Sequence, residues 1–260
     1  MPGIPAAPAV RLEGATVRFV SERGAVTALD KVSVAIPAGG FVTLLGPSGC
    51  GKSTLLRLIA DLVPATEGQV TVLGGTPAAA RATRQLGFVF QDSTLLPWRS
   101  ALANVRLPLE VGPRKGETAG RRTPGELLRL VGLGGREAAL PHELSGGMRQ
   151  RVAIARALVT EPRLLLMDEP FGALDEITRD SLNEELLRIW QETSTTVVFV
   201  THSIPEAVFL SQQVLVLATN PGRVRELVDC ALPYPRPLGI RETTAFVRVA
   251  AHLRVLLETC

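Results

Sequence analysis

The sequence predicts an α/β protein in which short apolar strands alternate with amphipathic helices around a parallel sheet. Two observations lead to this prediction. Runs of four or five apolar residues, typical of strands buried on both faces, recur at Phe41 to Leu45 and at Leu164 to Met167. Apolar residues at helical spacing lie between such runs, as at Leu182, Leu186 and Ile189. An antiparallel β-rich part near the N-terminus and an inserted helical part in mid-chain complete the expected architecture.

Residues 10–38 are β-rich, with a polar turn at residues 21–24 between two strand-like stretches. The next apolar run ends in a Gly-rich loop, and a helix is expected after it because Leu55, Leu58, Ile59 and Leu62 share one face. Along the chain, the expected strands are Val10 to Val20, Val26 to Ile36, Phe41 to Leu45, Val70 to Leu73, Phe88 to Phe90, Leu164 to Met167 and Val197 to Val200.

The middle of the chain, from about residue 95 to 160, is rich in Leu and Arg and is predicted to be mostly helical. A polar loop from Gly112 to Gly125 interrupts it, and an amphipathic segment from Phe246 to Leu257 is expected to pack on the core. We interpret residues 1–260 as one domain. Its expected parts are a core with the β-rich part (about 10–93 and 160–224), a helical part (94–159) and a short helical tail (225–260).

Composition and charge exclude several classes of protein. The 260 residues are 46% hydrophobic and 20% charged, which is ordinary for a globular chain with one core. A net charge of +3 without a basic patch interleaved with aromatics argues against a nucleic-acid partner. The three cysteines are too scattered for a disulfide framework or a zinc site. Without an apolar run of about 18 residues or a signal-like start, a cytosolic location is expected, with any membrane role through a separate chain.

The segment from Gly46 to Thr54 fits the phosphate-loop pattern G-x-x-x-x-G-K-[ST], and it follows a strand and opens a helix as that motif requires. Glycines let the backbone wrap a polyphosphate, and the helix N-terminus favours its negative charge. Lys52 would reach the β- and γ-phosphates of ATP, and the Ser53 hydroxyl would ligate Mg²⁺. The helix start near Lys52 also predicts a lowered thiol pKa for Cys50, with a small space-filling residue as the alternative. The predicted nucleotide-binding residues are Gly46, Pro47, Ser48, Gly49, Cys50, Gly51, Lys52, Ser53 and Thr54.

Two carboxylates follow the apolar strand Leu164 to Met167. Ligands of doubly wound sheets sit at the carboxyl ends of the strands, which places Asp168 beside the phosphate loop as a predicted Mg²⁺ ligand, direct or through water. Glu169 would lie on the other side of the strand end and polarise an attacking water. These residues and the parallel sheet predict a P-loop NTPase (RecA-like) core, with an antiparallel β-subdomain and an inserted α-helical subdomain.

A second helix start, Leu144-Ser145-Gly146-Gly147, also predicts an anion-binding N-terminus. One chain therefore carries two phosphate-seeking helix starts but only one complete nucleotide pocket. Either both helix starts converge on one nucleotide within the chain, or Ser145, Gly146 and Gly147 serve a nucleotide bound to another copy.

The phosphate loop, LSGGMRQR at 144–151, LLLMDEP at 164–170 and Val200-Thr201-His202 together resemble the ABC ATPase family in order and spacing, from about Val10 to Val224. The resemblance implies a head-to-tail dimer in which Ser145, Gly146 and Gly147 contact the γ-phosphate held by the partner's phosphate loop. It further implies a Mg²⁺ and water contact for Gln91, a γ-phosphate contact for His202, a bridge between the two sites for Asp175 and adenine stacking for Phe19.

Three positions depart from the family pattern. Phe19 stands where Tyr is commoner, with a core position as the alternative; Gly172 stands where many relatives have Ser, and Asp61 where they usually have Gly.

Four segments, LLPWRSALANV, DEPFGALDEITR, THSIPEAVFLS and PGRV, look like the family branch that imports nitrate, alkanesulfonates, taurine or thiamine-precursor pyrimidines. That resemblance implies a transmembrane permease, a periplasmic or lipoprotein solute-binding protein, and a place on the cytoplasmic face of the bacterial inner membrane. Trp98 follows Gln91 where the family has a groove for a permease helix, so we expect an interface anchor, with a core Trp as the alternative.

Two alternatives to an importer subunit are disfavoured by the sequence. A non-transport ABC ATPase of DNA repair or of ribosomes is disfavoured, because only about 90 residues without sustained heptads separate the phosphate loop from LSGG and the chain has one cassette. A P-loop small-molecule kinase would leave LSGG and Glu169 unexplained.

Overall fold

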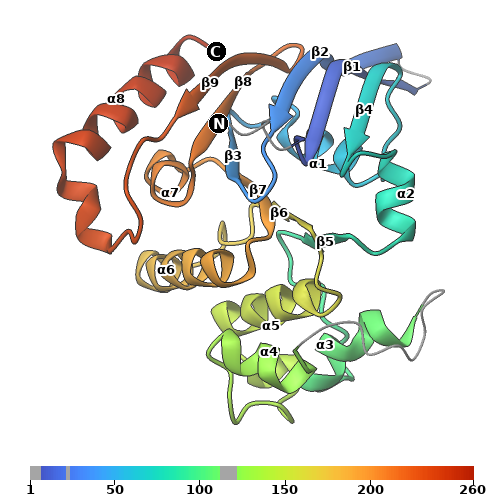
Figure 1. The fold of residues 1–260 in the computed structure, drawn as a ribbon, viewed down its shortest axis with the longest axis vertical. Coiled ribbons are helices and arrows are strands. Elements are labelled where there is room, and N and C mark those ends of the chain that lie inside the picture. Colours follow the sequence, from blue (N-terminus) through green and yellow to red (C-terminus); the bar gives the residue numbers. More distant parts are fainter. Residues whose placement is uncertain (1–6, 22–23, 112–121) are drawn as a thin grey trace, which may run out of the picture.

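The computed structural model describes residues 7–21, 24–111 and 122–260, and Figure 1 shows two β-sheets with helices around them. The larger sheet has six strands in the order β5-β6-β7-β3-β8-β9. All neighbouring strands in it are parallel except the pair β8 and β9. Its strands are β3 (Phe41–Leu45), β5 (Leu86–Val89), β6 (Leu164–Asp168), β7 (Thr196–Thr201), β8 (Gln213–Ala218) and β9 (Arg223–Asp229). The predicted α/β fold with a parallel sheet is confirmed.

The smaller sheet is antiparallel, in the order β2-β1-β4, with β1 (Val10–Ser21), β2 (Gly24–Ile36) and β4 (Glu67–Val72). Helix α1 (Lys52–Ile59) contacts both β2 and the large sheet. Leu29, Leu44 and Leu56 therefore belong to one buried cluster that joins the two sheets. The predicted strands of this region are confirmed, except that the last one begins earlier, at Glu67, and ends before Leu73.

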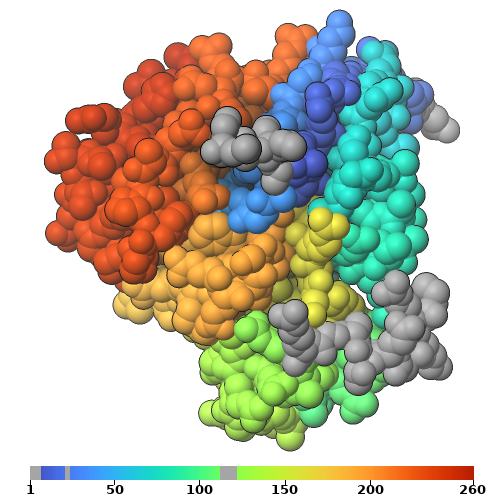
Figure 2. Space-filling view, in the orientation of Figure 1, coloured from blue at the N-terminus to red at the C-terminus, as the bar shows by residue number. Residues whose placement is uncertain are grey.

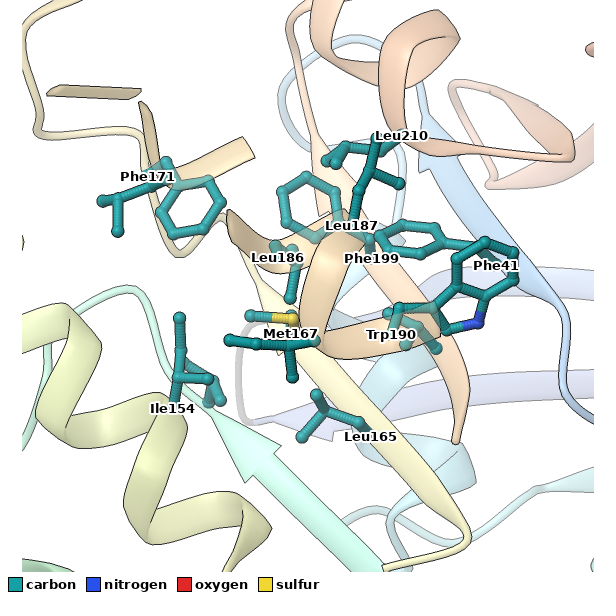
Figure 3. Close-up of a cluster of buried hydrophobic side chains, with 14 of the residues drawn as sticks. Phe41, Ile154, Leu165, Met167, Phe171, Leu186, Leu187, Trp190, Phe199 and Leu210 are labelled. Atoms are coloured by element: carbon teal, nitrogen blue, oxygen red, sulfur yellow. The ribbon is translucent and has the colours of Figure 1, made fainter. Parts of the chain in front are cut away.

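Both faces of the large sheet are covered, because alternate residues of its central strands point to different clusters. In β3, Phe41 and Leu45 face one cluster while Val42 and Leu44 face the other. In the first of these clusters the Phe41 ring meets the Trp190 ring edge-on at 5.8 Å, as Figure 3 shows. Burial on both faces explains the continuous apolar runs of β3, β6 and β7.

The helical middle of the chain projects from one side of the sheet (lower part of Figures 1 and 2). It contains α3 (Ala101–Glu110), α4 (Pro124–Leu130) and α5 (Gly146–Leu158). The predicted loop at Gly112 to Gly125 is partly wrong, because Pro124 and Gly125 belong to α4; residues 112–121 lie outside the described residues. Thr123 caps this helix by accepting a hydrogen bond from the Glu126 N–H, and Pro124 suits its first position.

The end of the first predicted helix is also corrected. Helix α1 ends at Ile59, and Leu62 is exposed rather than on its buried face. Asp61 adopts φ 60°, a left-handed conformation that ends helices and favours glycine. This explains why a glycine suits that position in relatives. The Asp61 carboxylate instead accepts a hydrogen bond from Arg81 Nε at 2.9 Å.

The remaining part of the described chain contributes the helices α6 (Glu176–Thr193), α7 (Ile204–Leu210) and α8 (Thr244–Glu258). The short helix α2 (Pro77–Ala82) lies earlier, between β4 and β5. The predicted helix from Phe246 to Leu257 is confirmed within α8. The expected tail does not start as a helix at 225, because the chain continues to Asp229 in β9, paired with β8. None of the helices in the described ranges is long and apolar enough to cross a membrane.

A buried guanidinium fastens the segment after β9 to α7. Arg236 donates hydrogen bonds to the carbonyl oxygens of five residues and lies 3.9 Å from the centre of the Tyr234 ring. The five acceptors are Val208, Phe209, Ser211, Cys230 and Leu232. The C-terminal part is thus tied by main-chain contacts to the helix that follows His202.

Candidate functional site

The phosphate loop joins β3 to α1, and Lys52 opens the helix. The Lys52 side chain is buried, and its Nζ donates hydrogen bonds to the carbonyl oxygens of Gly46 (2.8 Å) and Pro47 (3.0 Å). These contacts hold the ammonium group over the loop itself, where a bound polyphosphate would meet it.

Three backbone segments come together behind the loop. A Cβ on Gly51 would lie 2.8 Å from the Ala28 carbonyl oxygen, and one on Gly222 would lie 2.3 Å from the Cys50 carbonyl oxygen. Gly51 also has φ 93°, which disfavours any side chain. The Gly222 N–H donates to the Ala28 oxygen at 3.2 Å, so β2 and the turn before β9 both support the loop.

The Cys50 thiol lies under the loop rather than at its open side. It is 0% exposed, and a Cβ on Gly46 would lie 2.6 Å from its sulfur. Burial raises the pKa of the Cys50 thiol, and the Lys52 charge opposes this only in part. The predicted lowered pKa is therefore wrong, because the side chain points into the core and not toward the helix start.

We expect the buried Cys50 to resist alkylation in the folded protein. A raised pKa leaves less thiolate near neutral pH, and the thiolate is the nucleophile, so labelling should be at least about 10-fold slower than after unfolding. Mass spectrometry after iodoacetamide treatment, in native buffer and in denaturant, measures both rates. The partly exposed Cys260 is the internal control. Faster labelling of Cys50 than of Cys260 in native buffer would contradict the burial.

Ser53 and Asp168 meet beside the phosphate loop. The Ser53 hydroxyl donates to Asp168 Oδ1 at 2.8 Å, which joins the start of α1 to the end of β6. Asp168 is buried, and this burial raises its pKa against the Ser53 hydrogen bond and the Arg57 and Lys52 charges. Two adjacent oxygen ligands, one a buried carboxylate, fit a small hard cation such as Mg²⁺.

Glu169 and His202 meet at the next strand end. Glu169 follows β6 and His202 follows β7, and Glu169 Oε2 lies 3.2 Å from His202 Nδ1. The Glu169 N–H donates to the Val200 oxygen at 3.1 Å, and the residue adopts φ 43°. Sequence reasoning chose both residues but did not predict this direct contact, which depends on β6 and β7 being neighbours.

The second predicted anion-binding helix start is exposed. Ser145 caps α5, its Oγ accepting a hydrogen bond from the Met148 N–H at 3.2 Å, and Ser145 and Gly146 face solvent. Gly147 allows close packing on α6, since a Cβ there would lie 2.7 Å from Thr178 Cγ2. Figure 1 draws α5 and α1 on opposite sides of β6.

The segment after β5 is tied to α5. Gln91 is exposed, and the Phe90 carbonyl just before it accepts a hydrogen bond from Gln150 Nε2 at 3.1 Å. Arg156 donates to the carbonyl oxygens of Ser93 (2.7 Å) and Thr94 (2.8 Å). Sequence reasoning missed Gln150 and Arg156. Gln150 could have been recognised in the sequence, because it is a polar residue on the otherwise apolar face of the predicted helix.

Phe19 and Asp175 are both on the surface. Phe19 is 45% exposed, so the alternative of a core position is wrong. It lies two residues after Val17 in β1. Val17 pairs with Leu29 of β2, and the Leu29 side chain packs against Gly51 of the phosphate loop. Asp175 caps α6 with Oδ1 2.9 Å from the Thr178 N of the helix. The backbone hydrogen bond from Thr178 lowers the Asp175 pKa.

The profile of the ABC transporter family matches residues 29–172, which cover the phosphate loop, the LSGG segment and both strand-end carboxylates. The chain belongs to the ABC transporter family. It is 52% identical to the taurine import ATP-binding protein TauB of Rhizobium johnstonii over 96% of this chain and 97% of that protein. It is 45% identical to the aliphatic sulfonates import ATP-binding protein SsuB of Bacillus subtilis over 84% and 83%.

A solved ABC structure has the same fold. The ATP-binding cassette MJ0796, in a dimeric post-hydrolysis state bound to ADP and Pi, superposes with a TM-score of 0.73 at 35% identity, over 86% of this chain and 100% of that one. The chain is accordingly an ATPase of the ABC transporter family.

Proposed function

We propose that this chain is the ATP-hydrolysing subunit of an importer, in which two copies act with a separate permease. The observation that carries the proposal is the arrangement of two strand ends beside Lys52: Ser53 with Asp168, and Glu169 with His202. One pair supplies oxygen ligands, and the other supplies a carboxylate base with an imidazole beside it.

The roles we assign rest on this geometry and, for Phe19 and Gln91, on the family resemblance alone. Backbone N–H groups of the phosphate loop and Lys52 bind the phosphates, and Phe19 stacks on the adenine. Ser53 and Asp168, with Gln91, would hold Mg²⁺, which would supply positive charge to neutralise the transferred phosphoryl group. Glu169 accepts a proton from the attacking water, and His202 Nδ1 fixes the orientation of that carboxylate.

The exposed cap of α5 supports a second copy as the missing half of the site. Ser145 and Gly146 face solvent, and α5 lies across β6 from the phosphate loop in the same chain. We assign Ser145, Gly146 and Gly147 to the γ-phosphate bound by a partner copy, with Asp175 between the two sites. Of the two arrangements that the sequence leaves open, the one with another copy is thus favoured.

The relatives support the solute class and the membrane partner that we propose. Proteins named for taurine import and for aliphatic sulfonate import match most of this chain, which supports a sulfonate-type solute and disfavours a role in DNA repair or on ribosomes. Nitrate or a thiamine-precursor pyrimidine remains within the predicted branch. A permease then places the chain on the cytoplasmic face of the membrane, and a solute-binding protein delivers the solute.

Trp98 provides the test of the permease partner. The Trp98 side chain is 72% exposed, so the alternative of a core position is wrong. It follows Thr94, whose carbonyl oxygen is hydrogen-bonded by Arg156 of α5. A large exposed aromatic suits an interface anchor, whose loss typically costs about 2 kcal/mol or more of binding. Trp98→Ala should keep basal ATPase activity and lose co-purification with the permease.

The assembled complex also tests the solute. In liposomes, ATP hydrolysis by the wild-type complex should rise with a solute-binding protein loaded with taurine or an alkanesulfonate, and the Trp98→Ala complex should show no such rise. Val255→Ala, an exposed apolar residue on α8, is the matched control and should assemble normally. Normal recovery and stimulation of Trp98→Ala would contradict the assigned docking residue. A complex that no sulfonate stimulates would contradict the solute class.

A further inference from the structure

A buried acid lies directly behind His202. Glu206, in the first turn of α7, is only 5% exposed, and its Oε2 accepts a hydrogen bond from the Thr201 hydroxyl. The same Thr201 oxygen accepts from the Ser203 N–H at 3.0 Å, and Ser203 Oγ accepts from the Glu206 N–H at 3.4 Å. Together these bonds close a turn with His202 at its centre.

The other side of Glu206 faces α6. Asn183, which is 0% exposed, and Arg179 approach the carboxylate from that helix. Arg179 Nη2 donates to the Leu174 carbonyl oxygen at 2.7 Å, in the loop that ends at Asp175. Arg179 therefore contacts this loop by a hydrogen bond and acts on the Glu206 carboxylate through its charge.

Burying these polar groups costs folding free energy. By strict geometry, Glu206 Oε1, both amide atoms of Asn183 and Arg179 Nε have no hydrogen-bond partner among the described residues. The Asn183 side chain is nevertheless near enough to the carboxylate to oppose, in part, the rise in the Glu206 pKa that burial causes. A buried polar atom without a good partner costs up to about 1–3 kcal/mol, whereas an apolar side chain of similar size would avoid that cost. A role in holding the turn explains why an acid occupies the position.

We propose that Glu206 is a positioning residue for ATP hydrolysis, which fixes the His202 turn against Glu169 and joins it to the loop before α6. Glu206 is too deeply buried to contact nucleotide, so it acts through Thr201. The inference rests on the proposed roles of Glu169 and His202.

The imidazole signals of the full-length protein test the positioning directly. The chain has three histidines, so the NMR signal of His202 can be followed beside those of His142 and His252. Glu206→Ala should move the His202 signal alone. Glu206→Gln should restore it, because the amide oxygen can still accept from Thr201. Thr201→Val, which removes the hydroxyl from the other end, should move it too and serves if Glu206→Ala does not fold.

Steady-state kinetics give the second reading. Glu206→Ala should lower kcat about 10-fold or more with KM for MgATP changed less than about twofold, since misplacing a catalytic group affects the chemical step and leaves binding intact. Glu206→Gln should recover most of the loss. The control is Glu185→Gln on α6, which removes a different, partly buried carboxylate that is paired with Arg151. This variant should leave the His202 signal and kcat unchanged.

Two outcomes separate this inference from the proposed function. An unmoved His202 signal in folded Glu206→Ala or Thr201→Val protein would overturn the positioning role. A moved signal would support it even if Glu169→Gln hydrolysed ATP normally, a result that contradicts only the assigned base.

Discussion

Glu169→Gln is expected to lower ATP hydrolysis by about 100-fold or more, as the loss of a general base does. The amide keeps the size of the side chain and an oxygen that can accept a hydrogen bond, so nucleotide binding should survive. Because Lys52 of one copy and Ser145 of the other would hold each nucleotide, uncleaved ATP should join two copies. Ligands stabilise the state that they contact best, so the variant should be dimeric with ATP and monomeric with ADP.

Adding Ser145→Arg supplies the matched test of the second copy. The larger cation at the exposed cap of α5 should abolish the ATP-dependent dimer without abolishing nucleotide binding. Light scattering with ATP and with ADP measures the dimer, and equilibrium dialysis measures binding. A Glu169→Gln protein that hydrolyses normally would contradict the assigned base, and one that stays monomeric at saturating ATP would contradict the shared site.

Arg236→Met is expected to destabilise the fold by about 3 kcal/mol or more, because each buried carbonyl oxygen left without a hydrogen bond costs about 1–3 kcal/mol. The methionine fills much of the same space but removes the Arg236 hydrogen bonds from five buried carbonyl oxygens. Of these, the Cys230 oxygen keeps the Leu232 N–H as a donor. Urea unfolding followed by circular dichroism gives the free energy. Arg254→Met, an exposed arginine of α8, is the control and should change it by less than about 0.5 kcal/mol. Equal stabilities would show that the guanidinium contacts contribute nothing.

The strands and the phosphate loop could be predicted from sequence because burial on both faces leaves continuous apolar runs, and because the loop has a fixed pattern of glycines. The contact of Glu169 with His202 could not be predicted in the same way, since it depends on which strands are neighbours in the sheet. That order is set by packing between residues far apart in the chain.

The errors have local causes. The pKa of Cys50 was predicted in the wrong direction because the motif fixes the backbone of the loop and not the direction in which that side chain points. The loop prediction failed at Pro124 and Gly125 because a polar, Gly-containing segment hides a capped helix start. Glu206 resembles an ordinary capping residue in sequence, and only its burial and its contact with Thr201 set it apart.

The meeting of Gly51, Ala28 and Gly222 has a mechanical consequence. With no side chain between these three backbones, the sheet that carries Phe19 and the loop that carries Lys52 are braced as one stiff frame. These main-chain contacts then fix the distance between the adenine-binding and phosphate-binding parts of the site. We therefore expect the sheet and the loop to move together in any rearrangement of the chain, with the spacing between Phe19 and Lys52 unchanged.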